Sequence, residues 1–143
     1  MIVYTQGSFD LFHVGHVNLL KRCLELAGDD GFVIVALLSD EAYTKYRGYA
    51  PVIPFDQRRE ILSSCRFVDV VIESDNEHTK DEVEKLHADV IVVGSDWASK
   101  DLAGQYRVSK EWLYPKLLYV PYTEETSSTK IKASFGGGEH DQY

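Results

Sequence analysis

Five short apolar runs recur along the chain, and stretches with helical spacing separate most of them. The runs cover residues 2–5, 32–38, 68–72, 90–93 and 117–120, and β-branched residues are frequent in them. Strands that alternate with helices form a mainly parallel sheet with helices on both faces. The sequence therefore predicts a five-stranded α/β fold, in which ligands bind beyond the carboxyl ends of the strands.

The stretches between these runs indicate where the helices lie. Apolar residues at helical spacing precede Gly28, so the first helix is predicted to end there. We expect further helices from Pro54 onward, over 79–87 and over 126–133, and a helical turn followed by a loop over 39–54. One domain over residues 1–134 and a glycine-rich tail over 135–143 complete the prediction.

Charge and cysteine content exclude several classes of protein. Fifteen basic residues against 23 acidic ones give a net charge of −8, which argues against nucleic acid and anionic lipid as partners. Cys23 and Cys65 show no metal-ligand or disulfide spacing, so both are expected to be buried thiols. No apolar run reaches membrane-spanning length and no secretion signal is visible, so we expect a cytoplasmic protein.

The strongest chemical signal is the run GSFDLFHVGH over residues 7–16, which follows the first predicted strand. Gly7 permits a tight turn, and His13 and His16 lie three residues apart at the start of the next helix. Free N–H groups and the positive end of the helix dipole gather there, which favours a phosphate. Two imidazoles at this place can donate hydrogen bonds to a phosphate whose charge grows in a transition state.

Two simpler interpretations exist for these histidines: they are surface residues at a helix start, or they are a pair of metal ligands. Two ligands without a nearby cysteine or third histidine make a poor zinc site. The Gly-x-Phe-Asp sequence before them and the position after a strand favour the phosphate site.

The run over 7–16 resembles the GTFDxxHxGH signature of a nucleotidyltransferase superfamily. This superfamily includes the glycerol-3-phosphate, phosphocholine and phosphoethanolamine cytidylyltransferases and, more remotely, pantetheine-phosphate adenylyltransferase. The resemblance continues through RFVD at 66–69, GSDW at 94–97 and SSTKIK at 127–132, and it is strongest to the bacterial glycerol-3-phosphate type. It implies a Rossmann-like domain that commonly forms a homodimer.

The resemblance also implies a reaction. A phosphate oxygen of a small phosphorylated alcohol, first of all sn-glycerol 3-phosphate, attacks the α-phosphorus of CTP, and pyrophosphate leaves without a covalent enzyme intermediate. Catalysis then rests on positioning and on neutralising the charge that builds at the phosphates. Mg2+ is the expected cofactor, bound through the triphosphate and not by protein side chains.

Matching positions imply three groups of site residues. The expected catalytic residues are His13, His16 and Lys45. The acceptor is expected at Asp10, Lys45, Arg58 and Lys80. The residues expected to bind CTP are Gly7, Ser8, Phe9, Gly15, Arg47, Asp96, Trp97, Tyr122, Thr126, Ser127, Ser128 and Thr129.

Two of these assignments, Lys80 and Arg58, compete with structural roles. Lys80 also fits a solvated helix face. Arg58 and Arg59 stand at a helix start, which is unfavourable for cations, and a salt bridge to Asp56 or Glu60 is the alternative account.

The pair that follows the fourth predicted strand also has two interpretations. Asp96 offers a carboxylate that can accept a hydrogen bond from the amino group of cytosine, or it caps the next turn. Trp97 either lines the same site or packs at the sheet edge.

The segment over 122–129 aligns with the family sequence RTEGISTT but departs from it twice. Tyr122 replaces an arginine, and Glu125-Thr126 replaces Gly-Ile, which removes a cation and adds a carboxylate beside a polyanion. A serine-rich helix cap is the alternative interpretation of this segment.

The substrate pair stays open within this chemistry. The acceptor can instead be another polyol phosphate, phosphoethanolamine, a phosphonate or a sugar phosphate, and ATP can replace CTP. A non-catalytic nucleotide-binding module is the alternative from a different class. Because CTP and a phosphomonoester are anionic, we expect a local positive pocket in an acidic protein, formed by His13, His16, Lys45, Arg47, Arg58, Lys80, Lys130 and Lys132.

Overall fold

The computed structural model describes residues 1–121 and contains one five-stranded parallel sheet. Its strands are β1 (Ile2–Gly7), β2 (Phe32–Leu38), β3 (Val70–Ser74), β4 (Val90–Gly94) and β5 (Leu117–Val120). The strand order is β3-β2-β1-β4-β5, and every neighbouring pair is parallel. The predicted fold class is confirmed, and the third strand begins two residues later than expected.

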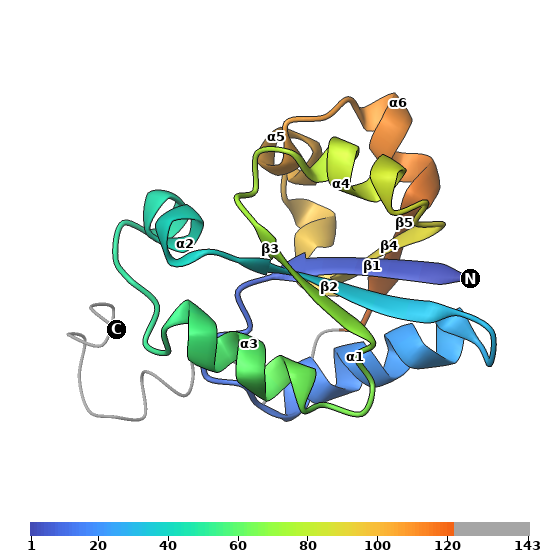
Figure 1. Ribbon diagram of the computed structural model, residues 1–143. Coiled ribbons are helices and arrows are strands. Elements are labelled where there is room, and N and C mark those ends of the chain that lie inside the picture. Colours follow the sequence, from blue (N-terminus) through green and yellow to red (C-terminus); the bar gives the residue numbers. More distant parts are fainter. Residues whose placement is uncertain (122–143) are drawn as a thin grey trace.

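Helices cover both faces of this sheet (Figure 1). The helices α1 (Val14–Ala27) and α3 (Phe55–Ser63) lie on one face, below the sheet in this view. The other face carries α4 (Thr79–Lys85), α5 (Leu102–Tyr106) and α6 (Lys110–Leu113), while α2 (Asp40–Arg47) stands beyond the carboxyl end of β2. Two 3-10 helices, η1 (Ser95–Ser99) and η2 (Tyr114–Lys116), flank α5 and α6 in the chain.

The alternation of side chains along the strands builds a core on each face. Val3 and Val33 pack with the α1 residue Cys23 on one face, whereas Tyr4 and Ile91 pack on the other. All five of these side chains are buried. The second cysteine, Cys65, is half-buried, and both thiols are free.

The strand order creates a switch point between β1 and β4. The chain winds from β1 through β2 to β3 on one side, and β4 and β5 then add on the other side of β1. Loops that leave the two central strands in opposite directions open a crevice at their carboxyl ends. The motif over 7–16 follows β1, and η1 follows β4, so both meet at this crevice.

Residues 39–54 contain more helix than the sequence predicts. Asp40–Arg47 forms a full helix, capped by Ser39 Oγ, which accepts from the Ala42 N–H at 3.1 Å. Gly48 closes it in a left-handed conformation, with φ at 84°. The predicted helical turn is therefore too short, because this helix buries only Ala42 and Tyr43 and is otherwise polar in sequence.

Candidate functional site

The loop between β1 and α1 turns sharply to present its histidines. Phe9 and Leu11 adopt φ values of 48° and 50°, the left-handed region that side chains rarely occupy. A Cβ atom added at Gly7 would lie 3.2 Å from Phe9 Cε2, so glycine permits this close approach. Phe9 itself is buried in the core and anchors the loop.

Two backbone hydrogen bonds fix the orientation of the histidine rings. His13 is the N-cap of α1, and its Nδ1 accepts from the Gly15 N–H at 3.0 Å. His16 reaches back, and its Nδ1 accepts from the His13 N–H at 3.2 Å. A ring nitrogen that accepts carries no hydrogen, so both neutral imidazoles place their proton on Nε2. The two rings stack at the start of the helix, with centroids 3.8 Å apart and an angle of 27° between their planes.

The environment keeps both histidines uncharged. His16 packs against the rings of Phe9 and Phe12, and its burial, followed by the nearby His13, lowers its pKa to about 3. Burial also lowers the pKa of His13. The prediction that these two residues add positive charge is therefore wrong, because burial disfavours their charged forms. In the neutral form each ring has one Nε2–H donor to offer at the N-terminus of α1.

The pKa shift of His16 predicts how the stability depends on pH. Because its folded pKa lies near 3 and its ordinary value is 6.5, the unfolded chain binds more protons between these values. Stability should therefore be complete above pH 6.5 and fall as pH decreases, by at most about 1.4 kcal/mol per pH unit for this group. His16→Gln should keep the capping hydrogen bond without titrating.

Urea unfolding of the wild type and His16→Gln at pH 7 and pH 5 checks this prediction. Between these two values the free energy of unfolding of the wild type should fall by about 1–2 kcal/mol more than that of the variant. Equal losses would contradict the assigned shift. Comparing the two proteins cancels the contributions of other groups, such as His78, whose pKa Asp75 raises.

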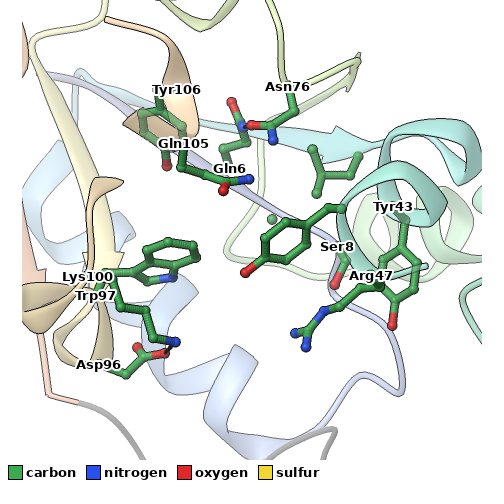
Figure 2. A pocket seen from close by; sticks show the side chains of 13 residues that line it. Gln6, Ser8, Tyr43, Arg47, Asn76, Asp96, Trp97, Lys100, Gln105 and Tyr106 are labelled. Carbon is green, nitrogen blue, oxygen red and sulfur yellow. Dashed lines mark hydrogen bonds and ion pairs between the residues drawn. The ribbon is translucent and has the colours of Figure 1, made fainter. Parts of the chain in front are cut away.

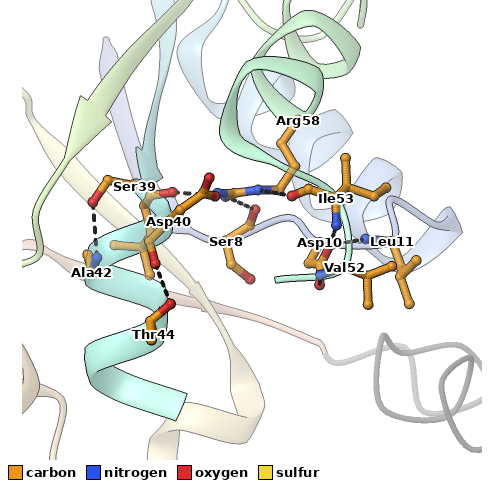
Figure 3. A network of polar contacts seen from close by, with 11 residues as sticks. Ser8, Asp10, Leu11, Ser39, Asp40, Ala42, Thr44, Val52, Ile53 and Arg58 are labelled. Atoms are coloured by element: carbon orange, nitrogen blue, oxygen red, sulfur yellow. Dashed lines mark hydrogen bonds and ion pairs between the residues drawn. The ribbon is translucent and has the colours of Figure 1, made fainter. Parts of the chain in front are cut away.

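Asp10 serves as a tether inside the protein. It is 1% exposed, and its carboxylate accepts from the N–H groups of Val52 at 2.8 Å and Ile53 at 2.9 Å (Figure 3). These bonds hold the segment between α2 and α3 against the β1–α1 loop. The expected contact with the acceptor is therefore replaced by a positioning role, since both oxygens face the backbone.

Arg58 joins three loops at the carboxyl ends of the strands (Figure 3). Its side chain is fully buried, and Nη1 donates to the carbonyls of Ser8 and Leu38, both at 2.9 Å. Nε donates to the Ile53 carbonyl at 2.8 Å, and Nη2 pairs with Asp40 at 2.7 Å. Every nitrogen is thus used within the protein, so in this structure Arg58 holds the β1–α1 loop at Ser8 and has no N–H group directed to an acceptor. Its ionic partner is Asp40, not the neighbouring acids on α3.

A cavity of about 190 Å³ opens in the crevice (Figure 2). Five of the expected CTP-binding residues line it: Gly7, Ser8, Arg47, Asp96 and Trp97. The sequence did not predict the other lining residues, which are Gln6, Leu38, Tyr43, Tyr46, Asn76, Lys100, Gln105 and Tyr106. Spacing could have identified one of them, because Lys100 lies four residues after Asp96 and its Nζ stands 4.0 Å from that carboxylate.

The expected lysines lie on exposed surfaces near the crevice. Lys45 on α2 pairs with Glu77 at 2.9 Å, and Arg107 reaches the same carboxylate at 3.5 Å. This double contact lowers the pKa of Glu77. Lys80 on α4 instead stands 3.9 Å from Glu84, so in this structure it follows the helix surface. Neither lysine is among the residues that line the cavity in the described part of the chain.

The remaining predicted contacts lie beyond residue 121, where the structure is not described. They are Tyr122, Thr126, Ser127, Ser128 and Thr129, together with the predicted helix over 126–133, the cations Lys130 and Lys132, and the tail. Within residues 1–121, no group of three His, Cys, Asp or Glu side chains is arranged to hold a metal ion. No helix in that range is long and apolar enough to cross a membrane.

Comparisons with known proteins identify relatives of this chain. Glycerol-3-phosphate cytidylyltransferase from Staphylococcus aureus is 38% identical over 136 residues, which cover 94% of this chain and 95% of that protein. The FAD synthase of Pyrococcus abyssi is 43% identical over 95 residues, covering 66% of this chain and 62% of that protein. A solved structure, the lipopolysaccharide core biosynthesis protein from Thermoplasma volcanium, shares the fold with a TM-score of 0.65 at 24% identity. It covers 86% of this chain and 96% of its own.

A family model supplies the remaining comparison. The model described as cytidylyltransferase-like matches residues 4–134, which include the histidine motif, η1 and the segment over 122–129. The match covers most of the chain. The protein therefore belongs to the cytidylyltransferase-like family.

Proposed function

We propose that this protein transfers CMP from CTP to sn-glycerol 3-phosphate and releases CDP-glycerol and pyrophosphate. The observation that carries the proposal is the stacked pair His13 and His16 at the start of α1, in the loop that continues from the cavity-lining residues Gly7 and Ser8. The resemblance to glycerol-3-phosphate cytidylyltransferases over nearly the full chain supports the choice of substrates.

The chemistry requires one bond to form and one to break at the α-phosphorus. An oxygen of the acceptor phosphate attacks this phosphorus, and the bond to the bridging oxygen of pyrophosphate breaks. Negative charge moves onto the departing pyrophosphate and the oxygens of the α-phosphate. Neutral donors at fixed positions, such as the two imidazoles, stabilise this charge without reorganising.

Cations near the crevice have complementary roles in this proposal. Arg47 and Lys100 line the cavity and are placed to neutralise the triphosphate. Lys45 is exposed, and its ion-pair partner among residues 1–121 is Glu77, so it can move to a substrate phosphate when one binds. Asp96 and Trp97 are proposed to hold the base, the former by accepting from its amino group.

Mg2+ is proposed as the cofactor, and it would neutralise charge on the triphosphate when bound. The chemistry of the donor set fits an ion carried by the substrate. Asp96 is the only carboxylate among the described lining residues, and Lys100 stands beside it. An ion bound by the triphosphate needs no ligand from the side chains of residues 1–121, so Asp96 can stay beside Lys100.

A matrix of nucleotides and acceptors tests the proposal. Purified protein with Mg2+ should release pyrophosphate fastest with CTP and sn-glycerol 3-phosphate, and mass spectrometry should detect CDP-glycerol. Release only with another phosphorylated alcohol, phosphoethanolamine, a phosphonate or a sugar phosphate would overturn the acceptor. A preference for ATP would overturn the nucleotide, and this arm matters because cytosine and adenine both present an amino group to Asp96.

Location and assembly are proposed on separate grounds. A cytoplasmic location is supported by the two free thiols, because oxidising compartments favour disulfides. A homodimer is proposed from the family resemblance, and sedimentation of the purified protein at twice the chain mass of 16.2 kDa would support it.

A further inference from the structure

A series of hydrogen-bonded polar side chains runs from the buried face of the sheet into the cavity. Its buried members are Tyr4 on β1 and Thr79 at the start of α4, both 0% exposed. The Tyr4 hydroxyl lies within 2.8 Å of Gln6 Oε1, and Thr79 Oγ1 donates to the same oxygen at 3.0 Å. The single hydroxyl proton of Tyr4 is also within reach of Glu82 Oε2, at 2.7 Å, so Thr79 is the donor that holds the side-chain amide of Gln6, which lines the cavity.

Asn76 is the last member of this hydrogen-bonded series. Gln6 Nε2 donates to Asn76 Oδ1, and the Asn76 N–H donates to the buried Ser74 Oγ at 3.2 Å. The residue occupies the left-handed region with φ at 64°, which asparagine tolerates better than most residues. With Oδ1 engaged, Asn76 Nδ2 has no partner among residues 1–121 and is available as a donor in the cavity lining.

The charges around Asn76 indicate what this donor can bind. Asp75 and Glu77 flank it in the sequence, whereas the cations Arg47 and Lys100 line the opposite end of the cavity (Figure 2). Glu77 is paired with Lys45 and Arg107, and Asp75 is paired with His78, so these acids leave little free positive charge at the Asn76 end. A phosphate is attracted instead to the end that carries Arg47 and Lys100. A neutral oxygen, such as that of a hydroxyl group, suits the Asn76 end.

We propose that Asn76 binds a hydroxyl group of the acceptor substrate and that Gln6 positions its amide for this contact. The proposal rests on the function above, because it places the hydroxyl-bearing part of a phosphorylated alcohol at this end of the cavity. Asn76 then determines specificity, since an acceptor without the hydroxyl leaves its N–H unpaired.

The test compares acceptors with and without hydroxyl groups. Steady-state kinetics with CTP should be measured for sn-glycerol 3-phosphate and for propyl phosphate, in the wild type, Asn76→Gly and Asn76→Asp. Glycine removes the side chain and still accepts a positive φ, and aspartate keeps the shape but removes the N–H donors. Gln57→Ala, which removes an exposed amide on α3, is the matched control.

In both Asn76 variants, kcat/KM for glycerol 3-phosphate should fall about tenfold to a hundredfold, while propyl phosphate changes less than about twofold. The KM for CTP should not change, and Gln57→Ala should match the wild type. Equal losses for both acceptors, or a raised KM for CTP, would overturn the role of Asn76 while the proposed function stands. Absence of turnover by the wild type with every acceptor would overturn both.

Discussion

Alanine at position 16 is expected to lower kcat by about 10²–10³-fold, the usual cost of removing one preorganised donor from a developing oxyanion. The His16 Nε2–H is fixed by the hydrogen bond at Nδ1 and by stacking on His13, so the donor needs no rearrangement during the reaction. Because the interaction strengthens only in the transition state, kcat and kcat/KM should fall together. Stopped assays of pyrophosphate release measure both.

The decrease in kcat must be distinguished from a decrease caused by unfolding of the variant. His16→Ala also removes one bond of the helix cap, which costs about 1 kcal/mol, and urea unfolding measures this directly. His87→Asn is the matched control, since His87 is exposed and left-handed, with φ at 55°, and asparagine accepts that backbone. A rate within tenfold of the wild type for His16→Ala would exclude the proposed role of His16 and show that other groups carry the activity.

The five strands could be predicted from the sequence because each is a short apolar run between polar turns. Two of them, Phe32–Leu38 and Leu117–Val120, have the predicted bounds. The segment over 95–116 could not be predicted, since its helices and 3-10 turns span only three to five residues each. Such short helices show no periodicity, and their stability comes from contacts such as the packing of Leu102 and Leu113 against the sheet.

In the site, too, features set by neighbouring residues could be predicted, whereas features that depend on contacts between distant segments could not. The histidines could be predicted because their motif follows a strand and opens a helix. The buried roles of Asp10 and Arg58 depend on loops up to 50 residues apart, which spacing along the chain cannot show. The hydrogen-bonded series of side chains Tyr4, Gln6 and Asn76 likewise forms only after β1 and α4 have packed together.

Removal of the Arg58 guanidinium should cost more stability than any other single change discussed. In Arg58→Met, the carbonyls of Ser8, Leu38 and Ile53 would lose a buried donor, and Asp40 would lose its partner. Leaving such groups uncompensated typically costs about 3–5 kcal/mol. For a chain of this size, that loss corresponds to a decrease in Tm of roughly 10 °C. Thermal unfolding by circular dichroism measures it.

Arg59 provides the matched control for this prediction. It is the next residue on the same helix and is exposed, so Arg59→Met should change the Tm by no more than a few degrees. Arg58→Lys should give an intermediate loss, because lysine keeps the charge but cannot form four hydrogen bonds in the guanidinium geometry. Equal stability of the Arg58→Met and Arg59→Met variants would show that the three loops hold together without this side chain. The tether at Asp10 would then be the main contact that keeps the β1–α1 loop in place.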